Sequence, residues 1–191
     1  LEKIDDAGGV AAGRYALAGN LDAAGKTYGS AVVSSLSGTL AGLGHTISNL
    51  RIIEPVHDDY LQTPVGLVGT AQVGSAIRDI GLLGVDVSGY GRVGGLVGEN
   101  FGGAISRAYV TGKVQGVVNV GGLVGYNGSG FNLETGEFIV GNGIVSDSFS
   151  TAAVTASTRY AGGFSYIGGL VGRNFGATYK ILRSSATGRS E

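Results

Sequence analysis

The chain has 191 residues, enough for one well-buried domain and slightly too few for two ordinary ones. Its 13 basic and 14 acidic residues give a formal net charge of -1, and 43% of its residues are hydrophobic, so it resembles neither a disordered chain nor a nucleic-acid-binding protein. Glycine supplies 38 residues but proline only 2, without a strict triplet repeat, which excludes collagen and proline-rich linkers. So much glycine predicts many tight corners and close backbone approaches, as in repetitive β folds.

The N-terminal third predicts short β-strands separated by turns. Residues 15–22 form an alternating strand that ends in a turn, and residues 36–52 form two more strands around a glycine-rich turn. We expect these strands to be the first coils of a single solenoid. Residues 54–64 are polar and contain both prolines, so they predict a loop that leaves the stack.

From residue 65 onward a glycine-rich unit repeats four times. Its core is Gly-Leu-Val-Gly, and successive leucines are 29, 27 and 47 residues apart, the last step being one repeat plus an insertion at about residues 128–144. An asparagine follows the core in three repeats, whereas Ala71 takes its place in the first. The repeated positions are Leu67, Leu96, Leu123, Leu170, Asn100, Asn127 and Asn174. We expect the leucines to pack in the sheet or core, and the asparagines to form a ladder at a corner.

A second block follows each core, and its last three copies share a threonine at the seventh position. The copies are residues 105–112, 145–152 and 181–188, with a degenerate version at residues 77–84. The third position of each copy is charged, and the sign alternates along the chain: Asp79, Arg107, Asp147 and Arg183. If the units stack in register, opposite charges face each other in a stabilising ladder, which is not the pattern of a clustered acidic site.

Each unit contains two or three short β-type runs and leaves no room for a helix of about ten residues. A single unit cannot bury its apolar positions, but stacked units can, with each strand pairing to its counterpart one turn along. The sequence therefore predicts an all-β parallel β-helix, or β-solenoid, with coils of about 27 residues. We expect one body over residues 1–191, with N-terminal coils and a loop in residues 1–64 and the four repeats in residues 65–191.

The four Gly-Leu-Val-Gly blocks resemble the GLUG-motif repeats of large bacterial surface proteins, including filamentous-haemagglutinin-like adhesins and the non-catalytic regions of some immunoglobulin-A peptidases. Residues 38–50 look like the segment that often precedes such repeats, and residues 15–22 resemble a common haemagglutinin-type strand. The resemblance implies a right-handed β-helix in a secreted or surface-displayed bacterial protein, with a role in adhesion or as a stalk. It implies no catalytic residues.

Short motifs that suggest catalysis or cofactor binding lack the context they need. Residues 89–94 match the glycine spacing of a dinucleotide site, but another Gly-Leu-Val-Gly core follows where a helix is required. Residues 19–27 end in Gly-Lys-Thr without the spacing of a phosphate loop. His45 and His57 are the two histidines and cysteine is absent, so a zinc site is not expected, and residues 57–59 are better explained as a solvated loop. We predict no catalytic, cofactor-binding or metal-binding residues.

Aromatic residues in two turn-like segments are candidates for binding. Loops that project from a rigid scaffold often carry recognition, and aromatic faces suit sugars or apolar protein surfaces. The alternative is that these rings fold back over a sheet. The candidates are Tyr126, Phe131, Phe138, Tyr160, Phe164 and Tyr166.

Together these features predict a non-catalytic repeat segment of a secreted, cell-surface bacterial adhesin that acts as a rigid display or binding stalk. Its partner would be a glycan or protein on a host or neighbouring cell, with no nucleic acid, and with a membrane reached only through other parts of the protein. One alternative is a carbohydrate-active β-helix enzyme, either a polysaccharide lyase or a hydrolase. The other is a passive spacer in a surface protease. The chain begins at Leu1 and has no run of about 18 apolar residues, so we expect a fragment whose signal or anchor lies outside it.

Overall fold

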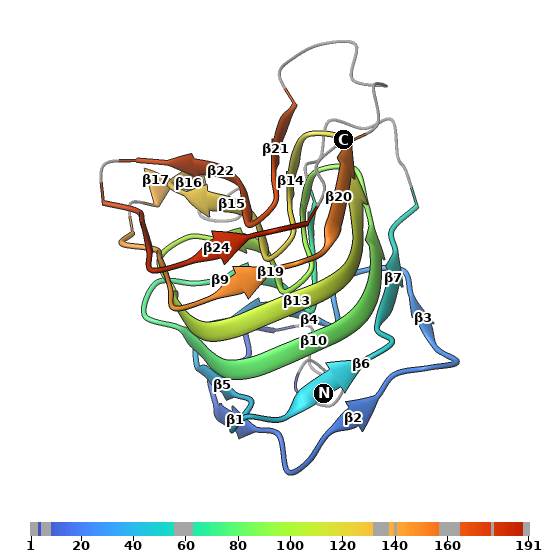
Figure 1. Cartoon of the computed structure of the whole chain (residues 1–191). Helices are drawn as coiled ribbons and strands as arrows, with labels where there is room; N and C mark the ends of the chain where they lie inside the picture. Colours follow the sequence, from blue (N-terminus) through green and yellow to red (C-terminus); the bar gives the residue numbers. More distant parts are fainter. Residues whose placement is uncertain are drawn as a thin grey trace.

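The computed structural model describes residue 4 and residues 9–55, 63–131, 138–139, 141–156, 165–176 and 178–188. Over these residues the fold is all-β, with parallel strands stacked in three sheets, consistent with a β-solenoid (Figure 1). We number the 13-stranded sheet 1, the five-stranded sheet 2 and the four-stranded sheet 3. From β7 onward the chain passes from sheet 1 to sheet 3, then to sheet 2, and returns to sheet 1 one layer along. In Figure 1 the coils rise from the N-terminal strands at the bottom to the C-terminal strands at the top. The predicted class, all-β with stacked parallel strands, is confirmed.

Sheet 1 contains the two longest strands, β10 (Ala76–Ser88) and β13 (Ala104–Gly116), which pair in parallel along nearly their whole length. The other coils follow the same path in shorter strands. On the N-terminal side these are β1 (Arg14–Ala16), β2 (Leu21–Asp22), β3 (Thr27–Tyr28), β5 (Thr39–Ala41), β6 (Thr46–Ser48) and β7 (Arg51–Ile53). On the C-terminal side they are β18 (Ile144–Ser146), β19 (Phe149–Ser150), β20 (Ala153–Ala156), β23 (Lys180–Leu182) and β24 (Ser185–Ala186).

Sheets 2 and 3 complete each coil and are built from shorter strands. Sheet 2 runs in the order β4 (Val33–Leu36), β9 (Val68–Ala71), β12 (Val97–Asn100), β15 (Val124–Gly128) and β22 (Val171–Phe175). Sheet 3 runs in the order β8 (Pro64–Val65), β11 (Arg92–Gly94), β14 (Asn119–Gly121) and β21 (Tyr166–Gly168). The insertion forms an antiparallel pair, β16 (Gly130–Phe131) with β17 (Phe138–Ile139), so it departs from the parallel pattern.

The repeated leucines lie at the turn between sheet 3 and sheet 2 and point into the core. Leu67, Leu96 and Leu123 are fully buried, and Leu170 in the last coil is 9% exposed. Their backbones are linked from coil to coil, because Leu96 N donates to Leu123 O at 3.0 Å and Leu123 N donates to Leu170 O at 2.9 Å. Burying one leucine side chain is worth about 1.5 to 3 kcal/mol, so the column is a major source of stability.

The glycines that flank each of these leucines allow backbones to meet without side chains between them. A Cβ atom on Gly98 of β12 would lie 2.7 Å from Pro64 C and 2.9 Å from Arg92 O, both in sheet 3. A Cβ atom on Gly95 would lie 2.6 Å from Gly122 O in the next coil. Sheets 2 and 3 therefore pack backbone against backbone, and the Gly-Leu-Val-Gly core needs glycine at both ends.

The three repeated asparagines occupy one register position on β12, β15 and β22. Asn100 Nδ2 donates to Asn127 Oδ1 at 2.8 Å, and Asn127 Nδ2 donates to Asn174 Oδ1 at 2.6 Å. Asn100 Oδ1 also accepts a hydrogen bond from Gly103 N at 2.7 Å. Ala71 holds the same position on β9, so the row of amides starts at Asn100. Asn100 and Asn127 are fully buried, and these bonds satisfy amides that would otherwise destabilise the interior.

The N-terminal strands belong to the same sheets as the repeats. β4 pairs with β9 in sheet 2, and β5 pairs with β10 in sheet 1. Most of the predicted loop, residues 56–62, lies outside the described residues. Among the residues that the structure describes, none form a helix long and apolar enough to span a membrane.

Candidate functional site

The six aromatic candidates differ in where they lie and in how far they are exposed. Tyr160 and Phe164 lie outside the described residues, and Phe131 is placed in β16 without a described side chain. Phe138 in β17 is 61% exposed. Tyr126 is buried, and its hydroxyl donates to Ser129 O at 2.7 Å. The remaining candidate, Tyr166, is partly buried at the start of β21 and lies close to the same arginine as Tyr126.

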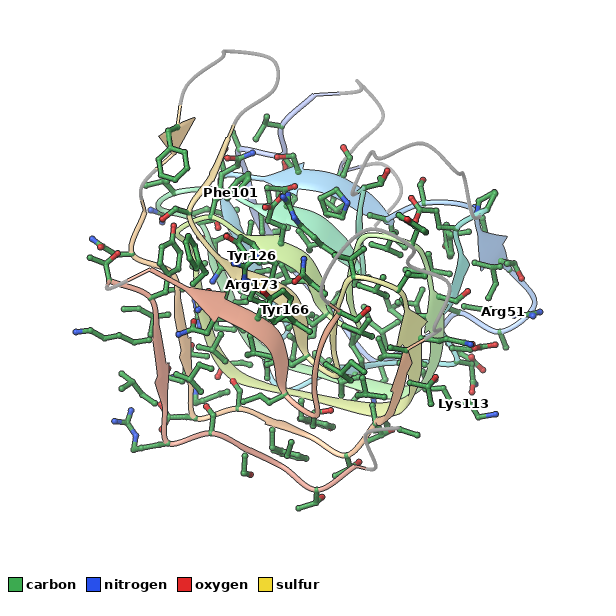
Figure 2. All side chains as sticks on the ribbon, turned by 90° about the horizontal axis from the view of Figure 1, so that it is seen from above. Arg51, Phe101, Lys113, Tyr126, Tyr166 and Arg173 are labelled. Carbon is green, nitrogen blue, oxygen red and sulfur yellow. The ribbon has the colours of Figure 1, made fainter. Side chains whose placement is uncertain are left out.

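That arginine, Arg173 on β22, gathers three rings at the C-terminal coil (Figure 2). Its Cζ atom lies 4.5 Å from the ring centroid of Tyr166, 4.7 Å from that of Phe175 and 5.8 Å from that of Tyr126. These are cation–π distances. Because Tyr126 and Arg173 belong to sheet 2 and Tyr166 to sheet 3, the contacts tie the two sheets together.

A buried carboxyl lies one strand away from this cluster. Glu99 is 2% exposed, and Arg92 Nη1 lies 2.5 Å from its Oε1, while Arg92 Cζ lies 5.1 Å from the Tyr126 ring centroid. The two charged groups are close enough for an ion pair. Their geometry does not give Arg92 Nε or Glu99 Oε1 a hydrogen-bond partner among the described residues. Burial raises the pKa of Glu99 from 4.5 to about 7, against the opposing effect of Arg92. The carboxyl is therefore partly protonated near neutral pH.

We call the bend of sheet 1 at Asp79, Arg107, Asp147 and Arg183 the corner. The alternating charges of the second block meet there. Arg107 donates through Nε and Nη2 to the two carboxylate oxygens of Asp79, at 2.5 and 3.0 Å. Arg183 binds Asp147 in the same bidentate way, at 2.6 and 2.8 Å. The hydrogen bonds from Arg107 and Arg183 lower the pKa of the Asp79 and Asp147 carboxyls, respectively. The expectation that opposite charges face each other is confirmed for these two pairs.

The backbone at this corner adopts the left-handed conformation without glycine. The φ angles are 56° at Asp79, 48° at Arg107, 50° at Asp147 and 43° at Arg183, and Leu43 in the preceding coil has 53°. Residues with a Cβ atom rarely adopt this conformation, whereas glycine adopts it without strain. The chain uses glycine for it elsewhere, for example at positions 25 and 84. The side chains at the corner are therefore retained at a cost in backbone strain.

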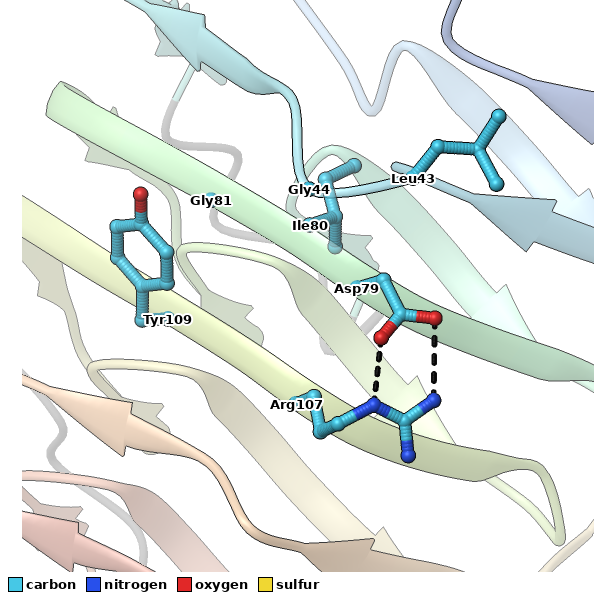
Figure 3. A pocket seen from close by; sticks show the side chains of 7 residues that line it. All are labelled: Leu43, Gly44, Asp79, Ile80, Gly81, Arg107 and Tyr109. Carbon is cyan, nitrogen blue, oxygen red and sulfur yellow. Dashed lines mark hydrogen bonds and ion pairs between the residues drawn. The ribbon is translucent and has the colours of Figure 1, made fainter.

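A hollow of about 360 Å³ opens beside the Asp79–Arg107 pair (Figure 3). Its lining consists of Leu43, Gly44, Asp79, Ile80, Gly81, Arg107 and Tyr109. The Tyr109 ring stands on one side and the ion pair on the other. The ring extends over Gly81, where a Cβ atom would lie 2.7 Å from its Cε1. Towards the next coil it stacks on Phe149, with centroids 5.0 Å apart and planes 2° apart.

Sequence reasoning missed this hollow, although the repeat contained a signal for it. Gly81, Tyr109, Phe149 and Ser185 are the fifth positions of the four second blocks, two positions after the alternating charges. The register of sheet 1 places them side by side. An aromatic pair next to a glycine in one column therefore indicates a ring that can lean over the glycine. Leu43 belongs to a coil where the repeat is not recognisable, and no pattern marks it.

A second row of exposed charges lies on another side of the molecule. Arg51, Asp86 and Lys113 are in register on β7, β10 and β13. Arg51 Nε lies 3.2 Å from Asp86 Oδ2, and both side chains are more than half exposed. Figure 2 shows Arg51 and Lys113 well away from the Arg173 cluster. An exposed pair of this kind contributes little to stability and describes a solvated face.

The structure describes the surroundings of the glycine motif at residues 89–94. Residues 89–94 end in β11, and β12 follows in place of a helix. Among the described residues there is no group of three histidine, cysteine or acidic side chains that could hold a metal ion. The segment 57–59, which was expected to be a solvated loop, lies outside the described residues.

Comparison with known proteins gives a family motif and a distant relative. Residues 89–115 match the family model described as the GLUG motif. The chain is also 28% identical over 189 residues to halomucin from Haloquadratum walsbyi, an alignment that covers 85% of this chain but only 2% of halomucin. No solved structure matches the chain. The resemblance to GLUG repeats is thus confirmed for residues 89–115, which contain the Gly-Leu-Val-Gly copy at residues 95–98. The chain also resembles a short part of a far longer protein.

Proposed function

We propose that this chain is a rigid, non-catalytic segment of a long, secreted or surface-displayed protein, and that it acts as an adhesive display stalk. In this proposal it is a right-handed β-solenoid with coils of about 27 residues. The observation that carries it is the continuous parallel pairing of sheet 2 from β4 to β22, backed by the buried leucine column. Because each coil contacts only its neighbours, such a stack extends in one direction and holds its faces at fixed spacing.

The comparisons support the setting of this stalk. The GLUG motif marks a repeat architecture, and similarity to a small part of the much longer halomucin suits a segment that is one of many in a large protein. We infer a place outside the cell, and a partner that is a glycan or a protein of another cell or surface. The proposal includes no enzymatic activity and no nucleic-acid partner.

A binding role is favoured over a passive spacer by the corner of sheet 1. A spacer needs only the packed core and a solvated surface, and glycine at the corner would serve it without strain. The chain instead keeps Leu43, Asp79 and Arg107 there in the left-handed conformation, around a hollow. Backbone strain of this kind is concentrated at functional sites in proteins.

The test is adhesion of particles coated with the folded chain. Beads carrying the 191-residue chain should be retained under flow on surfaces coated with polysaccharides or with extracellular proteins, more than beads carrying the heat-unfolded chain. Retention equal to that of the unfolded control on every surface would favour the passive spacer. Release of reducing ends or unsaturated products from a polysaccharide coat would instead indicate a carbohydrate-active enzyme and overturn the non-catalytic proposal.

A further inference from the structure

We propose that the hollow lined by Leu43, Gly81 and Tyr109 and closed by the Asp79–Arg107 pair binds one neutral hexose unit of a glycan. This inference rests on the proposed adhesive function and names the site and the ligand class. The hollow measures about 360 Å³, within the lower part of the range for small-molecule sites, and it is open on the surface of sheet 1. An open hollow of this size accommodates a single ring while the rest of the glycan continues over the surface.

The backbone of the lining supports the proposal. Leu43, Asp79 and Arg107 all have positive φ, and all three contribute side chains to the hollow. For Asp79 and Arg107 the ion pair gives a structural reason for a side chain, but Leu43 is 59% exposed and forms no such pair. Glycine at position 43 would relieve the backbone, and it would remove a side chain that is already mostly exposed. An exposed leucine held in this conformation is explained by an apolar surface that it offers to a ligand.

The Tyr109 ring forms an aromatic wall of the hollow. Phe149 stacks on Tyr109 with nearly parallel planes and so holds its ring in one orientation. Gly81 has no side chain and leaves room for the ring. A ring fixed in this way offers its face at little entropic cost, because no rotamer has to be frozen on binding. The apolar C–H face of a hexose packs on such a ring, while the Tyr109 hydroxyl, which has no hydrogen-bond partner among the described residues, can bind a sugar hydroxyl.

Asp79 and Arg107 form a polar wall of the hollow. Arg107 uses two of its five N–H groups on Asp79, and the Asp79 carboxylate accepts these two bonds and a third from Arg78 Nη1 at 3.0 Å. Donors of Arg107 and at least one acceptor site of Asp79 therefore remain for a ligand, and the Arg107 side chain is 56% exposed. A fixed mixture of donors and acceptors matches hydroxyl groups, which both donate and accept. Because the hollow presents both a carboxylate and a guanidinium, either an anion or a cation would be repelled by one of the two groups, and a neutral ligand suits the site better.

The experiment measures binding of neutral oligosaccharides to the intact chain. Hexasaccharides of glucose, mannose and galactose in several linkages are titrated by calorimetry, and polygalacturonate serves as the acidic arm. We expect at least one neutral hexasaccharide to bind, and Tyr109→Ala and Arg107→Gly each to weaken its affinity at least tenfold. Leu43→Gly should weaken it severalfold while leaving the urea midpoint of unfolding at or above that of the unchanged chain.

The matched control is Arg183→Gly. Arg183 has the same left-handed backbone and the same bidentate bond to an aspartate as Arg107, but it does not line the hollow. This variant should bind the sugar as tightly as the unchanged chain. If no neutral sugar binds at millimolar concentration, if only polygalacturonate binds, or if Arg183→Gly and Arg107→Gly weaken binding equally, the proposal is wrong. If coated beads still adhere to a surface and Tyr109→Ala leaves that adhesion unchanged, the sugar site fails while the adhesive function stands.

Discussion

Side chains are excluded from one side of the coil, where sheets 2 and 3 meet, but are kept on another side, at the corner of sheet 1. Where sheets 2 and 3 meet, side chains are excluded, and glycines such as Gly98 let one backbone rest on the other. At the corner of sheet 1, glycine would be the unstrained choice, yet Asp79 and Arg107 are present. The first side explains why the stack forms. At the second, the Asp79–Arg107 pair joins neighbouring coils, and we propose that it also lines a binding site.

The largest expected effect comes from placing a side chain between sheets 2 and 3. Gly98→Val should unfold the chain or cost more than about 4 kcal/mol, because neither backbone can move away without breaking its own sheet. Urea unfolding followed by circular dichroism measures the loss. Gly29→Ala is the control, since a Cβ atom there meets nothing within 4 Å, and it should change stability little. Equal effects of the two substitutions would contradict the tight packing of sheets 2 and 3.

The pH dependence of stability tests the contact between sheets 2 and 3, because Glu99 is buried there. Its folded pKa of about 7 exceeds 4.5, so the folded state holds the proton more tightly than the unfolded chain does. The stability associated with this proton is fully present below about pH 4.5 and is lost as the pH rises through 7. At 1.36 kcal/mol per pKa unit, Glu99→Gln should gain about 3 kcal/mol relative to the unchanged chain between pH 4.5 and pH 8.

The control for this titration is Asp86→Asn, which also removes one negative charge but from an exposed position. It should show no comparable gain over the same range. The two variants are compared by urea unfolding at several pH values. A Glu99→Gln variant whose relative stability stayed constant with pH would mean that the carboxyl is ionised throughout and fully compensated by Arg92.

The asparagine row should give an intermediate effect. Asn127 is fully buried and bonds to asparagines in both neighbouring coils, so Asn127→Ala leaves one N–H of the buried Asn100 amide without its partner. We expect a loss of about 2 kcal/mol in the free energy of unfolding. Asn174→Ala, at the exposed end of the row, should lose clearly less. If the two losses were equal, the row would not act as a buried network.

The stacked parallel fold could be predicted because each repeat contains the short sequence that produces the stacking. Gly-Leu-Val-Gly encodes a buried leucine between two backbone contacts, and its recurrence requires equivalent positions to stack. The facing charges followed from the same register. The hollow was not predicted, because it depends on how Tyr109 leans over Gly81 and on Leu43, which lies in a coil without a readable repeat. Contacts between residues at different positions of the repeat leave no periodic pattern in the sequence.

The smallest effect on stability is expected at the corner of sheet 1. Asp147→Gly removes an exposed ion pair and at the same time relieves a left-handed residue, so the two consequences oppose each other. The urea midpoint of this variant should stay close to that of the unchanged chain at low salt. In high salt the variant should gain stability relative to the unchanged chain, because the lost attraction is screened while the relief of the backbone is not. A large loss would show that the corner pairs hold the stack together. The corner side chains would then have a structural role, and the contrast between the two sides of the coil would no longer indicate a binding surface.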